Sequence, residues 1–143
     1  MWRIGELLVQ KKLISWAQLE EALKEQKESH RPVGEILIQK GSIPRPLLFK
    51  ALAEQHEMRF IELHRVRINP KAVELISPEM ARKLKIFPID FQEDTVIVAV
   101  DNPLTILPEE ELKQISSFNE VETVLCLPED IQAAIQEHYR EKT

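Results

Sequence analysis

The sequence predicts an α+β fold, in which an all-helical N-terminal lobe of two tandem helix-turn-helix repeats precedes a small, mainly antiparallel sheet with helices. The first observation is an internal repeat. Shifted by 29 residues, Gly5–Gln26 aligns with Gly34–Gln55, and eleven of these twenty-two positions are identical. The second is a change after residue 58, from helical periodicity to short apolar runs separated by turn residues. We therefore expect a tandem-repeat lobe over residues 1–58 and an α+β lobe over residues 59–143.

Each copy of the repeat is typical of a short helix, a tight turn and a longer helix. In the first copy, "GELLVQK" is the short helix and "KLIS" the turn, and Ser15 with Gln18 predicts a capping box that opens the longer helix. In the second copy "SIPRP" replaces the cap, and Pro44 and Pro46 suit the first turn of a helix. A unit of this size cannot bury its apolar face alone, so the two copies should pack on each other.

The second lobe alternates helices and strands. We expect a short strand in "FIEL", a short helix in "NPKAVELI", and a helix in "SPEMARKLK" with Ser77 as its cap. "IFPIDFQ" and "TVIVAV" flank a tight polar turn and predict a hairpin. A helix over 107–118, a strand in "VETVLCL" and a closing helix over 128–142 follow. The single cysteine, Cys126, is expected to be a buried thiol in a reducing compartment.

Charge limits the possible partners. The chain of 143 residues has a net charge of −5, which argues against DNA or RNA binding because that binding neutralises many phosphates with Lys and Arg. Residues 1–58 carry nine basic and eight acidic side chains (+1), and residues 59–143 carry ten basic and sixteen acidic (−6). An anionic small ligand is therefore expected on the first part. No run of apolar residues is long enough to cross a bilayer, and no signal peptide is evident, so we expect no membrane insertion and a cytoplasmic location.

The sequence lacks the motifs of common catalytic and metal sites. It has no GxxxxGK[ST] phosphate loop, and three glycines leave little room for a glycine-rich nucleotide cradle. Its four histidines show no HExxH or CxxC spacing, and no GxSxG elbow occurs. We expect no enzyme activity, no metal and no cofactor.

Two glycines mark the same place in the two copies. Gly5 and Gly34 stand at the start of each short helix, with Arg3 and Arg31 close by. A helix start presents free N–H groups and a partial positive charge, so two such starts could serve two phosphates. The alternative is that both glycines permit tight helix packing.

Two glutamines raise a similar choice. Gln26 and Gln55 end the otherwise apolar faces of the two long helices, and a buried amide there needs partners. A ligand edge is one possible partner. The alternative is that each amide bonds backbone of the neighbouring copy or reaches water.

These residues together resemble the tandem 24-residue motif of the MshEN domain, the N-terminal module of type II secretion and type IV pilus assembly ATPases. The copies span 3–26 and 32–55, and the similarity continues through "TVIVAVDNP" to the final helix. The matching positions are Arg3, Ile4, Gly5, Leu8, Val9, Leu13, Leu19, Leu23 and Gln26, then Val33, Gly34, Leu37, Ile38, Gly41, Ile43, Leu48, Leu52 and Gln55.

The resemblance implies a receptor for the bacterial second messenger cyclic di-GMP that regulates a secretion or pilus motor. It implies that Arg3 contacts guanine or phosphate, that Gln26 and Gln55 supply amides, and that Asp101 in "VDNP" reaches a guanine edge. The backbone at the two glycines would approach the ligand, between apolar walls from Leu8, Leu23, Val33, Leu37 and Leu52. The full set of expected ligand-binding residues is Arg3, Ile4, Gly5, Leu8, Val9, Leu23, Gln26, Arg31, Val33, Gly34, Leu37, Ile38, Leu52, Gln55 and Asp101.

The sequence departs from the family pattern at three positions. Lys12 stands where the first motif has glycine, Pro32 where the second has its basic residue, and Ser42 where an aliphatic residue is usual. The two half-sites are therefore not equivalent. An alternative function is a docking module that links a secretion or pilus ATPase to its inner-membrane platform protein without binding nucleotide. DNA binding through paired helix-turn-helix units is disfavoured by the net charge.

Overall fold

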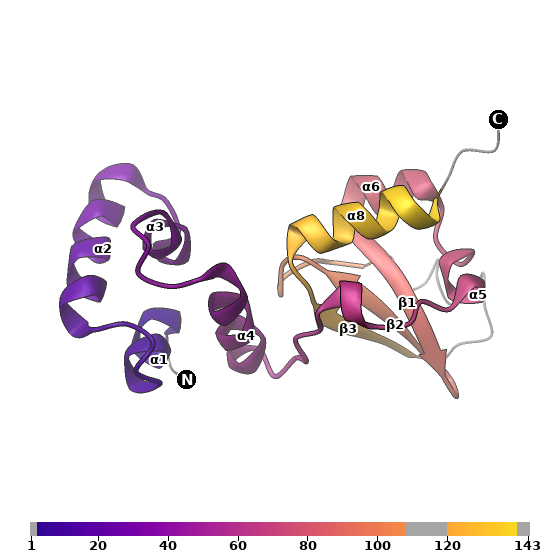
Figure 1. Ribbon diagram of the computed structural model, residues 1–143, viewed down its shortest axis with the longest axis horizontal. Coiled ribbons are helices and arrows are strands. Elements are labelled where there is room, and N and C mark those ends of the chain that lie inside the picture. The colour runs from indigo at the N-terminus through magenta and orange to yellow at the C-terminus, as the bar shows by residue number, and fades with distance from the viewer. Residues whose placement is uncertain (1–2, 108–119, 140–143) are drawn as a thin grey trace. The chain divides into compact units, whose positions relative to one another are not determined.

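The computed structural model describes residues 3–107 and 120–139, and it divides into two compact units, Met1–Glu57 and Met58–Thr143. The first unit is helical and the second contains a three-stranded sheet with helices, so the predicted α+β fold class is confirmed (Figure 1). The helices of the first unit are α1 (Ile4–Gln10), α2 (Trp16–Ser29), α3 (Val33–Gln39) and α4 (Arg45–Gln55).

The two copies of the repeat interlock in the first unit. Helix α1 of the first copy packs mainly against α4 of the second, and α3 of the second copy packs mainly against α2 of the first. Two ion pairs also join the copies. Lys11 at the end of α1 pairs with Glu54 of α4, and Lys40 at the end of α3 lies 3.4 Å from Glu21 of α2. Each short helix is therefore held by the other copy.

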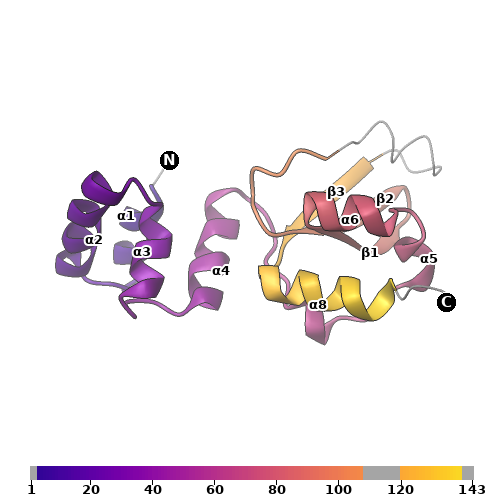
Figure 2. The ribbon, with the colours of Figure 1, turned by 90° about the horizontal axis from the view of Figure 1, so that it is seen from above.

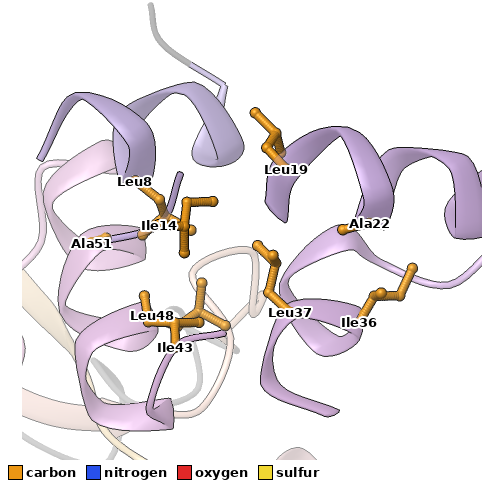
Figure 3. Packing of buried hydrophobic residues seen from close by; sticks show 9 residues of the cluster. All are labelled: Leu8, Ile14, Leu19, Ala22, Ile36, Leu37, Ile43, Leu48 and Ala51. Atoms are coloured by element: carbon orange, nitrogen blue, oxygen red, sulfur yellow. The ribbon is translucent and has the colours of Figure 1, made fainter. Parts of the chain in front are cut away.

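The core of the first unit repeats as the sequence does. Eight of its nine buried residues form four pairs separated by 29 positions (Figure 3). These pairs are Leu8 and Leu37, Ile14 and Ile43, Leu19 and Leu48, and Ala22 and Ala51. Since fully burying a Leu or Ile side chain stabilises a fold by about 1.5–3 kcal/mol, this shared core dominates the stability of the unit.

The caps of the long helices follow the sequence. The Ser15 hydroxyl accepts from the Gln18 N–H at 3.1 Å, and the Gln18 side chain accepts from the Ser15 N–H at 2.8 Å, which confirms the capping box. In the second copy Pro44 is the N-cap and Pro46 lies in the first turn of α4. Proline is tolerated there because the first N–H groups of a helix have no partner inside the helix.

The second unit is built on a sheet of strand order β1-β2-β3. The predicted hairpin is confirmed, with β1 (Ile86–Gln92) antiparallel to β2 (Thr95–Val100) and a bulge between Pro88 and Asp90. Strand β3 (Glu120–Leu125) runs parallel to β2, so the sheet is mixed. The remaining elements are η1 (Leu63–Arg65), α5 (Pro70–Val73), α6 (Pro78–Leu84) and α8 (Pro128–His138).

Helices α6 and α8 lie side by side on one face of this sheet (Figures 1 and 2). The Ser77 hydroxyl caps α6 by accepting from the Met80 N–H at 3.1 Å, as expected. Beyond the end of α8, the Tyr139 hydroxyl lies 2.8 Å from the Ile76 carbonyl oxygen and 3.1 Å from that of Val73. Burial raises the pKa of Tyr139, so the phenol stays protonated and donates to these carbonyls.

One predicted element of the second unit is wrong, and another lies mostly outside the described residues. The strand expected in "FIEL" is wrong, because Phe60 forms only an isolated bridge with Leu125 and a 3₁₀ turn begins at Leu63. The helix expected over 107–118 lies, from residue 108 onward, outside the described part of the chain.

Candidate ligand-binding site

The turn after each short helix has the same geometry in both copies. The Lys12 N–H donates to the Val9 carbonyl and the Leu13 N–H to the Leu8 carbonyl, both at 2.9 Å. The equivalent bonds in the second copy run from Gly41 to Ile38 at 3.0 Å and from Ser42 to Leu37 at 2.9 Å. This pattern is the Schellman motif, which ends a helix on a residue with left-handed backbone. Lys12 (φ 62°) and Gly41 (φ 74°) are those residues. Lys12, which replaces the glycine of the first motif, therefore has the backbone conformation of the glycine in the second.

Gly5 and Gly34 are packing residues in this structure. A methyl carbon added to Gly5 would lie 2.5 Å from Leu19 Cδ1, and one added to Gly34 would lie 3.0 Å from Leu48 Cδ2. Both contacts are closer than ordinary van der Waals distance, and both glycines are buried. Of the two alternatives for these glycines, the geometry favours close helix packing.

Arg3 stands at the start of α1. Arg3 is the N-cap, has extended backbone and is exposed, and within the described residues its side chain has no hydrogen bond or ion pair. Its carbonyl accepts from the Leu7 N–H at 2.9 Å, which closes the first turn and leaves the preceding helical N–H groups free. Arg3 therefore combines an uncommitted guanidinium with a helix start.

The start of α3 differs, because its arginine is already engaged. Arg31 precedes the N-cap Pro32, donates to the Gln39 side chain, and lies 3.8 Å from a Glu35 carboxylate oxygen. Both partners lie on α3 itself. An anion at this position would compete with the Glu35 carboxylate for Arg31.

Gln26 and Gln55 lie in the last turns of α2 and α4, as expected from the repeat. Both residues are only partly buried, and none of the described residues of the chain is a fully buried polar residue. Partial burial leaves both alternatives for these amides open, because each side chain can reach water or a ligand. The faces of α2 and α4 become accessible in their last turns, which leaves these amides within reach of water.

The apolar residues expected to contact the ligand differ in how far they are buried. Leu8 and Leu37 are fully buried in the shared core, so their side chains offer no surface to a ligand in this structure. Leu23 is 40% exposed. Five of the other expected residues are partly buried and pack against the core: Ile4, Val9, Val33, Ile38 and Leu52.

Asp101 belongs to the second unit, directly after the last residue of β2. It lines a groove with a volume of about 400 Å³, together with Arg82 and Lys85 from the end of α6 and residues of α8. Burial raises the pKa of the Asp101 carboxyl, and the nearby Lys85 charge acts in the opposite direction. No sequence motif singled out the two basic residues, of which Arg82 lies in the last turn of α6 and Lys85 directly follows that helix.

Among residues 3–107 and 120–139, no group of three or more His, Cys, Asp or Glu side chains is arranged to hold a metal ion. None of the described helices is both long enough and apolar enough to cross a membrane.

The chain is similar in sequence to part of two type IV pilus assembly ATPases. It is 33% identical over 140 residues to the type IV pilus assembly ATPase PilB of Myxococcus xanthus, covering 98% of this chain and 25% of the relative. It is 30% identical over 145 residues to the PilB of Thermus thermophilus, covering 97% of this chain and 16% of the relative. The chain thus spans a quarter or less of the length of these relatives.

A solved structure and a family description agree with this similarity. The structure described as "Structure of MshE with cdg" matches with a TM-score of 0.82 and 30% identity, covering 97% of this chain and 100% of that one. The sequence model of the MshEN domain matches residues 56–143, which include the second unit, whereas both copies of the tandem repeat lie before this range. On these matches, the chain belongs to the MshEN domain family.

Proposed function

We propose that this MshEN domain is a non-enzymatic receptor that binds cyclic di-GMP through the tandem motifs at 3–26 and 32–55 and thereby regulates a secretion or pilus assembly ATPase. The observation that carries the proposal is the similarity over its whole length to the MshE chain, which was solved with cdg, an abbreviation of cyclic di-GMP. The PilB relatives support the choice of an ATPase as the regulated partner.

The internal repeat supports a ligand with two similar halves. Cyclic di-GMP has two guanines and two phosphates, and the two copies have the same core positions and the same turn geometry. In this proposal Arg3 donates to a phosphate or guanine, and Gln26 and Gln55 hydrogen-bond the bases. Leu23, Val33 and Leu52 are the wall residues with accessible surface, and Asp101 accepts from a guanine N–H.

The differences between the copies predict unequal half-sites. Arg3 is exposed and uncommitted, whereas Arg31 is held by Gln39 and Glu35. The second half-site has Pro32 at the position of Arg3, so it lacks a basic side chain there. Most of the charge-assisted binding energy should therefore come from the first copy.

Isothermal titration of the chain with cyclic di-GMP tests the proposal, with GTP and cyclic di-AMP as competing ligands. We expect saturable binding that is selective for cyclic di-GMP. Arg3→Ala should weaken it by about 1.5–3 kcal/mol, the usual value of a hydrogen bond to a charged group. Lys24→Ala removes the same charge from an exposed position that is not one of the matching positions of the motif, and it should leave the affinity unchanged. Absence of binding by the wild-type chain would refute the receptor function.

A further inference from the structure

The groove of the second unit has the composition of a ligand site. It lies between α6 and α8, which run side by side over the sheet (Figure 2). Its volume of about 400 Å³ is within the usual range for small-molecule pockets. Every residue that lines it belongs to the second unit, so the groove exists independently of the tandem repeat.

The groove has an apolar floor. Ile131 and Ile135 face it from successive turns of α8, and Pro128 adds to the floor at the start of that helix. The two isoleucines are almost fully buried, at 2% and 6% exposure, so only the edges of their side chains border the groove, beside the partly exposed Pro128. Such a floor suits an aliphatic group.

Three charged side chains surround this floor. Arg82 and Lys85 are exposed, and within the described part of the chain neither forms an ion pair or a side-chain hydrogen bond. Asp101 lies in the same groove and is only partly exposed, and burial raises its pKa. The groove therefore holds charges of both signs that no side chain among the described residues neutralises by direct contact.

Lys85 has a backbone conformation that glycine adopts with less strain. It follows the last residue of α6, and its backbone is left-handed with φ 57°. A residue with a side chain pays roughly 1 kcal/mol for this conformation relative to glycine. The position next to the groove thus carries a lysine cation, close enough to Asp101 to lower the pKa of its carboxyl, despite this conformational cost.

We propose that this groove binds a small zwitterion with an aliphatic side chain, that is, a free aliphatic α-amino acid. The guanidinium of Arg82 has the planar fork that holds a carboxylate by two hydrogen bonds, and Lys85 adds a second cation. In the absence of nucleotide, the Asp101 carboxylate, to which the proposed function assigns a guanine N–H, accepts from the ammonium group instead. The aliphatic side chain lies on Pro128 and the accessible edges of Ile131 and Ile135. Gln132 and Gln136, one turn apart on the rim, supply further donors and acceptors.

The mixed charges argue against simpler ligands. A purely anionic ligand would face the Asp101 carboxylate, and a purely cationic one would face both Arg82 and Lys85. A polyanion is further disfavoured because the basic pair stands on a unit whose sequence, over 59–143, carries ten basic and sixteen acidic side chains. A single carboxylate next to a single ammonium group satisfies all three side chains.

Chemical-shift titration of the ¹⁵N-labelled chain of 143 residues with L-leucine tests the proposal in the absence of nucleotide. We expect saturable shifts confined to amides around Arg82 to Lys85, Asp101 and Ile131 to Gln136. Arg82→Gln should weaken the binding at least about tenfold, and Lys83→Gln, which removes the adjacent cation outside the groove, should not. Because all these substitutions are at exposed positions, the spectra of the variants also report whether the fold is intact.

Two analogues separate the contributions of the charged groups. 4-Methylpentanoate lacks the ammonium group of leucine and 3-methylbutylamine lacks its carboxylate, and each should bind at least about tenfold more weakly than leucine. The proposal is overturned if leucine leaves the groove amides unshifted, if either analogue binds as well as leucine, or if Lys83→Gln weakens binding as much as Arg82→Gln. Since no nucleotide is present, these outcomes are independent of whether the repeat binds cyclic di-GMP.

Discussion

Lys12 and Gly41 lie 29 residues apart and have the same left-handed backbone, with φ of 62° and 74°, at the end of equivalent helices. Lys12→Gly should therefore raise the free energy of unfolding by about 0.5–1 kcal/mol, because glycine adopts this conformation without a steric cost. Gly41→Ala should lower it by about 1 kcal/mol. No atom lies within 4 Å of the added methyl, so the backbone is the cause. Guanidinium unfolding of both variants measures the difference, and changes of the same sign would contradict the shared conformation.

Gly5→Ala should destabilise the first unit despite the higher helix propensity of alanine. The added methyl would lie 2.5 Å from Leu19 Cδ1 in a buried contact, and overpacking of this kind costs about 1–3 kcal/mol, against a gain of about 1 kcal/mol in propensity. Gly34→Ala, with 3.0 Å to Leu48 Cδ2, should be less harmful. In a double-mutant cycle, Gly5→Ala should cease to destabilise once Leu19→Ala has opened the space. Additive effects of the two substitutions would count against the contact.

The two arginines near the starts of the short helices should contribute unequally to cyclic di-GMP binding. Arg31 must give up Glu35 before it can neutralise a phosphate, whereas the Arg3 side chain has no partner within the described residues. Arg31→Ala should therefore weaken binding less than Arg3→Ala when both are measured by calorimetry in the same buffer. Glu35→Gln frees Arg31 and should strengthen binding, most clearly at low salt. An affinity lowered by Glu35→Gln would refute this competition.

Asp101→Asn should stabilise the folded chain at neutral pH. Burial raises the folded-state pKa of Asp101 above its ordinary value of 3.8, so the ionised carboxylate costs the folded state stability at higher pH. That cost diminishes as pH falls through the raised pKa, and it is absent well below 3.8, where the carboxyl is protonated in both states. Urea unfolding at pH 7 and pH 4 should show the larger gain at pH 7. A gain that is independent of pH would exclude this ionisation as its cause.

Cys126 should be unreactive in the folded chain. It is fully buried, and burial, with a smaller effect of the Asp130 charge, raises the pKa of its thiol to about 12. Because the thiolate is the reactive form, iodoacetamide at pH 8 should modify Cys126 only as the chain unfolds. Mass spectrometry over time, with a sample in guanidinium as the fast reference, measures this. Rapid modification under native conditions would show that the chain opens locally around Cys126, just after β3.

Patterns confined to one segment predicted the structure well. The repeat predicted the paired core, because equal sequences bury equal faces, and the Ser15 and Ser77 caps followed from local hydrogen bonding. The hairpin of β1 and β2 was predictable because a tight turn joins two apolar runs. These features depend on residues that are close in sequence.

Features that depend on distant segments were missed. The direction of β3 relative to β2 is set by the connection between them, which apolar periodicity does not encode. The packing role of Gly5 depends on Leu19 in the next helix, so its sequence position alone left two alternatives open. The groove is lined by Arg82 at the end of α6 and by Asp101 after β2, and no sequence pattern in either segment predicts that the two lie together.

The exchange of short helices between the copies has a further consequence. Since α1 packs on α4 as α3 packs on α2, the same surface is used twice, which is the isologous contact of a twofold homodimer written into one chain. A homodimer of a single repeat would carry every substitution in both halves at once. Covalent linkage removes that constraint. The second copy can therefore have Pro32 at the position equivalent to Arg3, and the first copy Lys12 at the position equivalent to Gly41, while the core stays symmetric.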